Sequence, residues 1–570
     1  MPVAVGALTL LVYAWRLDYS PIHLHYDEIF FGLQGQAIQS TGRDVQGRLL
    51  PLYFQLDATM NWYQPAAVYW TALVLSAVPL SDWAIRLPTV LLGVANVVLI
   101  YFVAWRVFRS TPWALLTSAM LMLTPAHFIH SRLAMDYLYP LPFLLGWLLG
   151  LLTYLERPSG RLLFVTTSCL GLGFFTYIAA VALMPMYLGV TLLVLWFGDR
   201  FRTDAGLAMA GFVWPLLALG LFLLRYPEVV PDLSGKYGLA VGGSGLDPMQ
   251  RLREAVNSRT VSDTLNFFHR YFSPGYMFVT GGSNLTNSTR ESGVFLVSCG
   301  VFLAAGLRHV LVNPTRTGAI LFAGFVTAPI PALVIPEDYA VDRVLAIVPF
   351  TVLLAAIGAQ RIWLAPLRQS PRTICGAAAG ALALVGVGYG IFSGRLSVST
   401  LLVLAAAGAL LVTGVAMERA RSWRPVVAAL LIVGLLQFVQ FRQDYFDGYR
   451  LRSAGWFGGN IRGAVEELIR LAAAGQAPEL HLSTDIPYIR SYWRFYLDVS
   501  ERQDLESRTR IFDGNTIAID RIPPNSLLLA AGNDPVILSL AKQGRIRLVG
   551  TATDPSDGGG DLPQFAIYQR

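Results

Sequence analysis

Two adjacent acidic residues, Asp27 and Glu28, are the first candidates for chemistry in the sequence. They follow an apolar run over residues 3–17 and begin a stretch that is predicted to continue as a helix to Ser40. Neighbouring side chains on a helix point about 100° apart, so one carboxylate can face a substrate while the other holds a neighbouring group. A helix cap is the alternative, because acidic side chains are favoured at helix N-termini.

A second polar segment, residues 127–137, contains His127, His130, Arg132 and Asp136. These side chains could bind a phosphate and orient a hydroxyl, and an interfacial loop of ordinary polarity is the alternative. The His-x-x-His spacing could also bind a metal, but the spacing fixes no third ligand. We therefore predict no metal site here.

Three further segments carry cations. Arg86 can pair with an acid or a phosphate, or extend to the membrane surface. Residues 266–274 place His269 and Arg270 among aromatic side chains, which suits a lipid-phosphate pocket and an aromatic belt equally. Arg343, preceded by the acidic segment 338–342, again indicates a phosphate or an acid as its partner.

The composition indicates which elements must position these residues. The 570-residue chain is 54% hydrophobic and 14% charged, whereas soluble domains carry about 25% charged residues. Its mean hydropathy is +0.52. The sequence therefore predicts an integral membrane protein. It contains no basic run that would indicate a nucleic-acid partner, and its three cysteines lie in apolar stretches without a disulfide pattern.

Thirteen apolar runs are candidate transmembrane helices. They cover residues 3–17, 86–108, 113–130, 137–155, 161–177, 178–197, 206–224, 293–312, 317–335, 343–363, 374–392, 398–417 and 424–441. The run 65–80 is rich in Trp, Tyr and Pro and suits an interfacial helix better.

Arginine positions predict the orientation. With the N-terminus inside, most loop arginines fall on the inner side, and the short outer loops hold only Arg132, Arg343 and Arg395. This topology makes residues 1–441 a transmembrane domain with outer loops at 18–85 and 225–292.

The segment 442–570 is then a small extracytoplasmic α/β domain. We expect a helix over 464–474 and strands over 479–483, 526–531 and 545–550.

The predicted span interiors are almost free of ionisable residues, which transporters and proton pumps usually need near mid-membrane. The charged side chains gather instead at the predicted outer ends of the spans. A site at the membrane–water boundary fits chemistry on a lipid headgroup better than passage through the bilayer.

Together these motifs resemble the GT-C glycosyltransferases of the protein O-mannosyltransferase and aminoarabinose-transferase type, including bacterial relatives that act on lipopolysaccharide. The resemblance covers most of residues 18–360. It rests on the pair Asp27–Glu28, on Arg86–Pro88, on Arg132 to Asp136, on Gly173–Tyr177 and on the segment from Arg343 to Pro349.

The resemblance implies an inverting transfer of a sugar from a polyprenyl-phosphate-linked donor to an acceptor hydroxyl outside the cytoplasm. It makes Asp27 the general base, gives Glu28 an organising role and lets Asp136 contact the acceptor or the base. It implies no metal and no cofactor. It also implies that arginines hold the leaving phosphate, and the substrate-binding residues that we predict are Arg86, Arg132, Tyr177, His269, Arg270 and Arg343.

One departure from the family pattern concerns the phosphate. Members often carry Lys-Pro-Pro in the first outer loop, where this chain has Tyr63–Gln64–Pro65. Either another cation replaces the lysine, with His269, Arg270 and Arg343 as the candidates, or the donor is held differently.

Two other function classes stay open at this point: a lipid or polysaccharide transporter or flippase, and a non-catalytic subunit of envelope assembly. The expected location is a bacterial inner membrane, with the active site and the C-terminal domain outside the cytoplasm. The expected partners are the lipid-linked donor, membrane lipids and a glycan, lipid or protein acceptor. The sequence identifies neither the sugar nor the acceptor.

Overall fold

The structure is a computed structural model of the chain. It describes residues 1–55, 62–198, 200–227, 229, 265–334, 339–365, 422–475, 477–513, 517–554 and 563–570, together with short helical stretches within 379–408.

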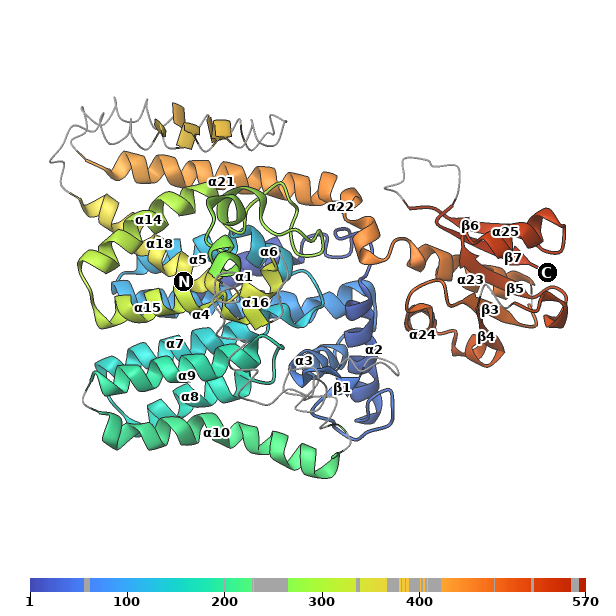
Figure 1. Cartoon of the computed structure of the whole chain (residues 1–570), viewed down its shortest axis with the longest axis horizontal. Coiled ribbons are helices and arrows are strands. Elements are labelled where there is room, and N and C mark those ends of the chain that lie inside the picture. Colours follow the sequence, from blue (N-terminus) through green and yellow to red (C-terminus); the bar gives the residue numbers. More distant parts are fainter. Residues whose placement is uncertain are drawn as a thin grey trace.

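The described residues up to Phe446 form a largely helical domain, and most of its long helices run roughly alongside one another in Figure 1. Among the described residues, six helical segments are long and apolar enough to cross a membrane. They are α4 (Asp82–Phe108), η1 with α7 (Asp136–Glu156), α10 (Phe201–Arg225), α15 with α16 (Arg316–Leu333), α18 (Ile347–Leu364) and α21 (Arg424–Phe446). Shorter apolar helices accompany them: α1 (Pro2–Ala14), α3 (Pro65–Leu75), α8 (Gly160–Gly173), α9 (Ala180–Trp196) and α14 (Val297–Val312).

The structure interrupts two of the predicted spans. The run 113–130 is divided into α5 (Thr111–Met122) and α6 (Pro125–His130), because Pro125 has no N–H to continue the helix. The run 317–335 is divided at Pro329 in the same way. The predicted spans 374–392 and 398–417 lie largely outside the described residues, so the number thirteen stays a prediction.

Two helices near the catalytic candidates match the sequence closely. Helix α2 (Tyr26–Thr41) extends one residue beyond the predicted end at Ser40. Helix α3 has 11 residues, about 16 Å at 1.5 Å per residue, which is too short to cross about 30 Å of hydrocarbon. The structure therefore agrees with the prediction that the run 65–80 does not cross the membrane.

The C-terminal part is a small α/β domain, drawn in orange and red in Figure 1. Its five strands have the order β4-β3-β5-β7-β6, with β4, β3 and β5 parallel and β7 antiparallel to both its neighbours. The strands are β3 (Leu480–Ser483), β4 (Thr509–Phe512), β5 (Leu527–Ala531), β6 (Arg547–Ala552) and β7 (Phe565–Gln569). The helices are α23 (Ile461–Gly475), α24 (Ile489–Val499) and α25 (Pro535–Lys542).

The predicted helix 464–474 is confirmed as α23, and the three predicted strands are confirmed as β3, β5 and β6. The strands β4 and β7 and the helix α24 were not expected from the sequence. Helix α24 is strongly amphipathic, and its buried face holds large aromatic side chains.

Helix α24 docks the C-terminal domain onto α2. The Tyr492 hydroxyl donates to the Leu24 carbonyl at 2.7 Å, and the rings of Tyr26 and Tyr488 stack with centroids 4.3 Å apart. A Cβ on Gly32 would lie 2.8 Å from the Phe495 ring. Only glycine permits this close approach without a shift of the ring, so α2 and α24 are closely packed.

Close helix packing in the membrane domain gives a first testable prediction. A Cβ on Gly358 of α18 would overlap the Phe302 carbonyl of α14, as is typical of small residues where membrane helices meet. We expect Gly358→Ala to lower the free energy of unfolding by about 1–3 kcal/mol, measured as a fall in Tm of the detergent-purified protein.

Gly189→Ala is the matched control. Gly189 lies inside α9 and has open space around the position of a Cβ, so this variant should keep or slightly raise the parent Tm, because alanine is the better helix former. An equal fall in both variants would contradict the packing explanation.

Candidate active site

The start of helix α2 is fixed by a capping box. The His25 side chain accepts a hydrogen bond from the Asp27 backbone N–H at 3.3 Å, and Glu28 Oε2 accepts from the His25 N–H at 3.0 Å. The predicted cap role of the acidic pair is therefore real for Glu28. The capping box uses the side chain of Glu28, whereas the side chain of Asp27 lies on another face of the helix.

Glu28 is also the centre of a buried ionic network. Arg86 Nε donates to Glu28 Oε1 at 2.8 Å and the Arg86 Nη2 donates to Oε2 at 3.0 Å. The Ala134 N–H donates to Oε1 at 2.9 Å. Glu28 is 0% exposed and Arg86 1%. This carboxylate therefore joins the start of α2, helix α4 and the segment after α6.

Asp27 points elsewhere, as helix geometry predicts for adjacent residues. The Tyr63 hydroxyl, on the short strand β2 (Trp62–Tyr63), donates to Asp27 Oδ1 at 2.6 Å. Burial, followed by the Asp27 charge, raises the pKa of Tyr63. The phenol therefore keeps its proton and remains a donor to the carboxylate.

Asp27 lines a cavity of about 280 Å³. The cavity lies where several helices end or begin: α2, η1, the connection from α8 to α9, and α17 (Val341–Val344). Its lining residues are His25, Tyr26, Asp27, Tyr63, Gln64, Asp136, Tyr137, Tyr177, Ile178, Asn284, Thr286, Asn287, Asp342 and Arg343. Four residues that the sequence analysis proposed for the site therefore meet here: Asp27, Asp136, Tyr177 and Arg343.

Asp342 is the main residue that the sequence analysis missed. Its Oδ2 accepts from the Tyr177 hydroxyl at 2.9 Å, and its Oδ1 accepts from Asn287 Nδ2 at 3.1 Å. Arg343 Nε lies 3.9 Å from Asp342 Oδ2. Burial raises the pKa of Asp342, and the Tyr177 hydrogen bond and the Arg343 charge oppose this shift. The sequence signal that could have identified Asp342 was its position directly before Arg343, a residue already proposed for the site.

Arg86 and Arg132 both have protein groups as partners. Arg132 is 0% exposed and donates to the backbone carbonyls of Tyr13, Trp15, Arg16 and Ser20. Neither arginine is among the residues that line the cavity. The geometry gives them a positioning role around residues 13–24.

The structure does not bring His269 and Arg270 to the cavity. They lie on a helical segment over residues 265–270, next to a part of the second outer loop that is outside the described residues. Their predicted contact with the donor stays a prediction.

The two histidines of the His-x-x-His motif are buried among protein partners. His127 Nδ1 lies 2.8 Å from the Tyr13 hydroxyl, and His130 Nδ1 lies 2.8 Å from the Ala126 carbonyl. Within the described ranges, no group of three or more His, Cys, Asp or Glu side chains is arranged to hold a metal ion.

The chain is similar in fold to several solved structures. ArnT from Cupriavidus metallidurans bound to undecaprenyl phosphate has a TM-score of 0.59 at 15% identity, over 99% of this chain and 97% of that chain. The same protein in the apo state has a TM-score of 0.58 at 15% identity, with the same coverage of both chains. An oligosaccharyltransferase from Archaeoglobus fulgidus in the apo form has a TM-score of 0.46 at 12% identity, over 91% of this chain and 65% of that chain.

The two matches to ArnT show the fold: the chain is an integral membrane protein with a GT-C fold and a small C-terminal α/β domain, and the predicted resemblance is confirmed at the level of the fold. The family model described as dolichyl-phosphate-mannose-protein mannosyltransferase matches residues 63–220. No curated protein sequence matches the chain.

The buried ion pair gives a second prediction. Replacing Glu28 by Gln leaves the Arg86 guanidinium buried without its counter-charge, which costs roughly 3–5 kcal/mol. We expect E28Q to lower Tm strongly in detergent. Asp504→Asn, which removes an exposed acid paired with Arg502, should leave Tm unchanged, because exposed pairs contribute little. Equal Tm values for both variants would contradict the anchoring role.

The raised pKa of Asp342 gives a third prediction. A raised pKa means that the folded protein holds this proton more tightly than the unfolded chain, whose aspartates titrate near 3.8. The resulting stabilisation is present below that pH and is lost as the pH rises through the folded pKa. Asp342→Asn does not titrate, so the Tm of this variant minus that of the parent should increase from about pH 4 to about pH 8.

The measurement is a series of paired melting curves over this pH range. A Tm difference that does not change with pH reports the altered hydrogen bonds with Tyr177 and Asn287. Only the slope of the Tm difference against pH reports the titration of Asp342. A difference that stays flat or falls with pH would contradict a raised pKa at Asp342.

Proposed function

We propose that this protein is an inverting glycosyltransferase that moves a sugar from a polyprenyl-phosphate-linked donor to an acceptor hydroxyl on the extracytoplasmic side of a membrane. One observation carries the proposal. Of two adjacent carboxylates, Glu28 is fixed by Arg86 and Asp27 lines a polar cavity where helices end. A carboxylate held in this way can act as a general base.

In the proposed reaction Asp27 accepts the proton of the acceptor hydroxyl while the hydroxyl oxygen bonds to the anomeric carbon of the sugar. The bond from that carbon to the donor phosphate breaks, and the phosphate leaves with the electron pair. Attack and departure on opposite faces invert the anomeric centre. The hydrogen bond from Tyr63 orients the carboxylate, and Asp136 contacts the acceptor.

Arg343 is the best-placed cation for the leaving phosphate. Among the described residues that line this cavity, Arg343 is the one arginine. Three aspartates share the cavity with it, Asp27, Asp136 and Asp342, so a phosphate is favoured only near the guanidinium. Burial raises the pKa of Asp342, the acid beside Arg343. Gln64, at the position of the family lysine, lines the same cavity without a charge.

The comparisons support the class of donor. The ArnT structure with the same fold is bound to undecaprenyl phosphate, and the matching family model is described by a dolichyl-phosphate-linked sugar. Undecaprenyl phosphate and dolichyl phosphate are both polyprenyl phosphates in the broad sense. The arginine distribution of the sequence supports the orientation, because it leaves the cavity end of the spans on the arginine-poor side.

Replacing Asp27 by Asn tests the proposal. Loss of a general base should reduce transfer by about 10²- to 10⁴-fold. The assay is mass spectrometry of envelope lipids and glycans from a deletion strain that carries the parent, the D27N variant or the control Asp520→Asn. Asp520 is an exposed acid of the C-terminal domain, so its variant should retain full transfer.

Size-exclusion profiles and Tm establish whether D27N is folded. Unchanged transfer by folded D27N would contradict the assignment of the base. Movement of a lipid or glycan across the membrane without any transfer, in the parent as in the variant, would contradict the enzyme and favour a transporter.

A further inference from the structure

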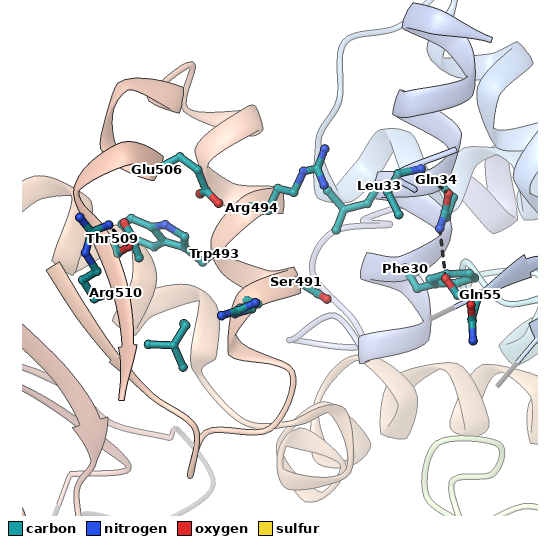
Figure 2. A pocket seen from close by; sticks show the side chains of 13 residues that line it. Phe30, Leu33, Gln34, Gln55, Ser491, Trp493, Arg494, Glu506, Thr509 and Arg510 are labelled. Carbon is teal, nitrogen blue, oxygen red and sulfur yellow. Dashed lines mark hydrogen bonds between the residues drawn. The ribbon is translucent and has the colours of Figure 1, made fainter. Parts of the chain in front are cut away.

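A second and larger cavity lies where the C-terminal domain meets helix α2. Its volume is about 490 Å³. Figure 2 shows side chains from α24 and β4 on one side of it and from α2 and the β1–β2 hairpin on the other. Strand β1 covers Phe54–Gln55. The mechanism proposed above uses none of the residues that line this cavity.

Three arginines line the second cavity, Arg490, Arg494 and Arg510, against one acid, Glu506, among its described lining residues. Arg490 and Arg494 are four residues apart on α24 and therefore share a helix face. Both are exposed, and neither has a hydrogen bond or ion pair with any residue that the structure describes. In Figure 2 Arg494 extends from α24 toward Leu33 of α2.

The cavity also offers uncharged polar groups. Trp493 is 2% exposed, and its Nε1 is a buried donor without a partner among the atoms that the structure describes. Gln34 on α2 is held by the Gln55 carbonyl and the Val45 N–H. Guanidinium groups bind phosphate and carboxylate groups in a bidentate manner. Together with an indole and an amide, they suit an anionic sugar.

The second cavity is adjacent to the candidate active site. Gln34 lies seven positions after Asp27, about 10 Å along a helix. The Phe30 ring lines the second cavity, and its centroid lies 4.6 Å from that of Tyr63, which donates to Asp27. The leaving phosphate of the donor must lie beside the bond that breaks, in the cavity of Asp27. An anion in the second cavity therefore belongs to the other substrate.

We propose that this second cavity is an acceptor subsite that binds a phosphate or carboxylate group on a glycan, while the reacting hydroxyl of the same molecule lies at Asp27. The proposal rests on the proposed transferase function for the identity of the bound molecule. The anion-binding property itself depends only on the geometry of α24, β4 and α2.

Binding of simple probes tests the anion site without any transfer reaction. Glucose 1-phosphate, glucuronate and glucose are titrated into the detergent-purified full-length protein and followed by saturation-transfer NMR. We expect glucose 1-phosphate or glucuronate to bind more tightly than glucose, and the preferred probe identifies phosphate or carboxylate. The double variant R490Q/R494Q should raise the Kd of that probe at least tenfold.

The control is R521Q/R547Q, which removes the same charge from exposed positions of the same domain away from the cavity. It should leave the Kd unchanged. Absence of binding by both anionic probes, equal affinity for glucose, or equal weakening in both double variants would overturn the site.

The acceptor role is tested by transfer kinetics with the envelope extract of the deletion strain as acceptor. R490Q/R494Q should raise the apparent KM for acceptor at least tenfold with little change in kcat, since no group at the reacting bond is altered. An unchanged KM would overturn the acceptor assignment. If D27N retained transfer, the reaction proposed at Asp27 would fail, while the NMR result would still decide the anion site.

Discussion

The buried pair of Glu28 and Arg86 is the interaction on which the geometry of the candidate active site depends. A guanidinium has five N–H donors, and all five are used here: two bonds go to Glu28 and the others to the carbonyls of Leu17, Pro21 and His23. Burying both charges costs free energy that only such complete pairing offsets. The start of α2 is thereby fixed on α4.

This anchor separates the roles of two adjacent acids. Because Glu28 is used by the cap and by Arg86, the helix turn directs Asp27 to the cavity, where Tyr63 holds one of its oxygens. Arg132 stabilises the same region by donating hydrogen bonds to backbone carbonyls of residues 13–20. The two arginines hold the backbone around Asp27, and Arg343 is left as the cation of the cavity.

What the sequence could predict follows from the range of the interactions. The divergence of Asp27 and Glu28, the extent of α2 and three of the five strands depend on local periodicity, and these were predicted correctly. The partners of Arg86 and Arg132 lie 58 to 119 residues away, so a single sequence could not distinguish a phosphate ligand from an internal partner. Asp342 was overlooked for a similar reason, because Tyr177 and Asn287 reach it from distant segments.

The second cavity could not be predicted at all, because α2 and α24 meet only after the whole chain has folded. Their contact also constrains how the cavities act together. Gly32 lies against Phe495, and Gly35 lies against Thr71 of α3 with no room for a Cβ, so α2 is held between two helices. Reaction rates depend steeply on the placement of reacting groups, and sites on rigid elements place them better than loops do. A single rigid helix that carries Asp27 near one cavity and Gln34 in the other fixes the distance between the base and the proposed anion site.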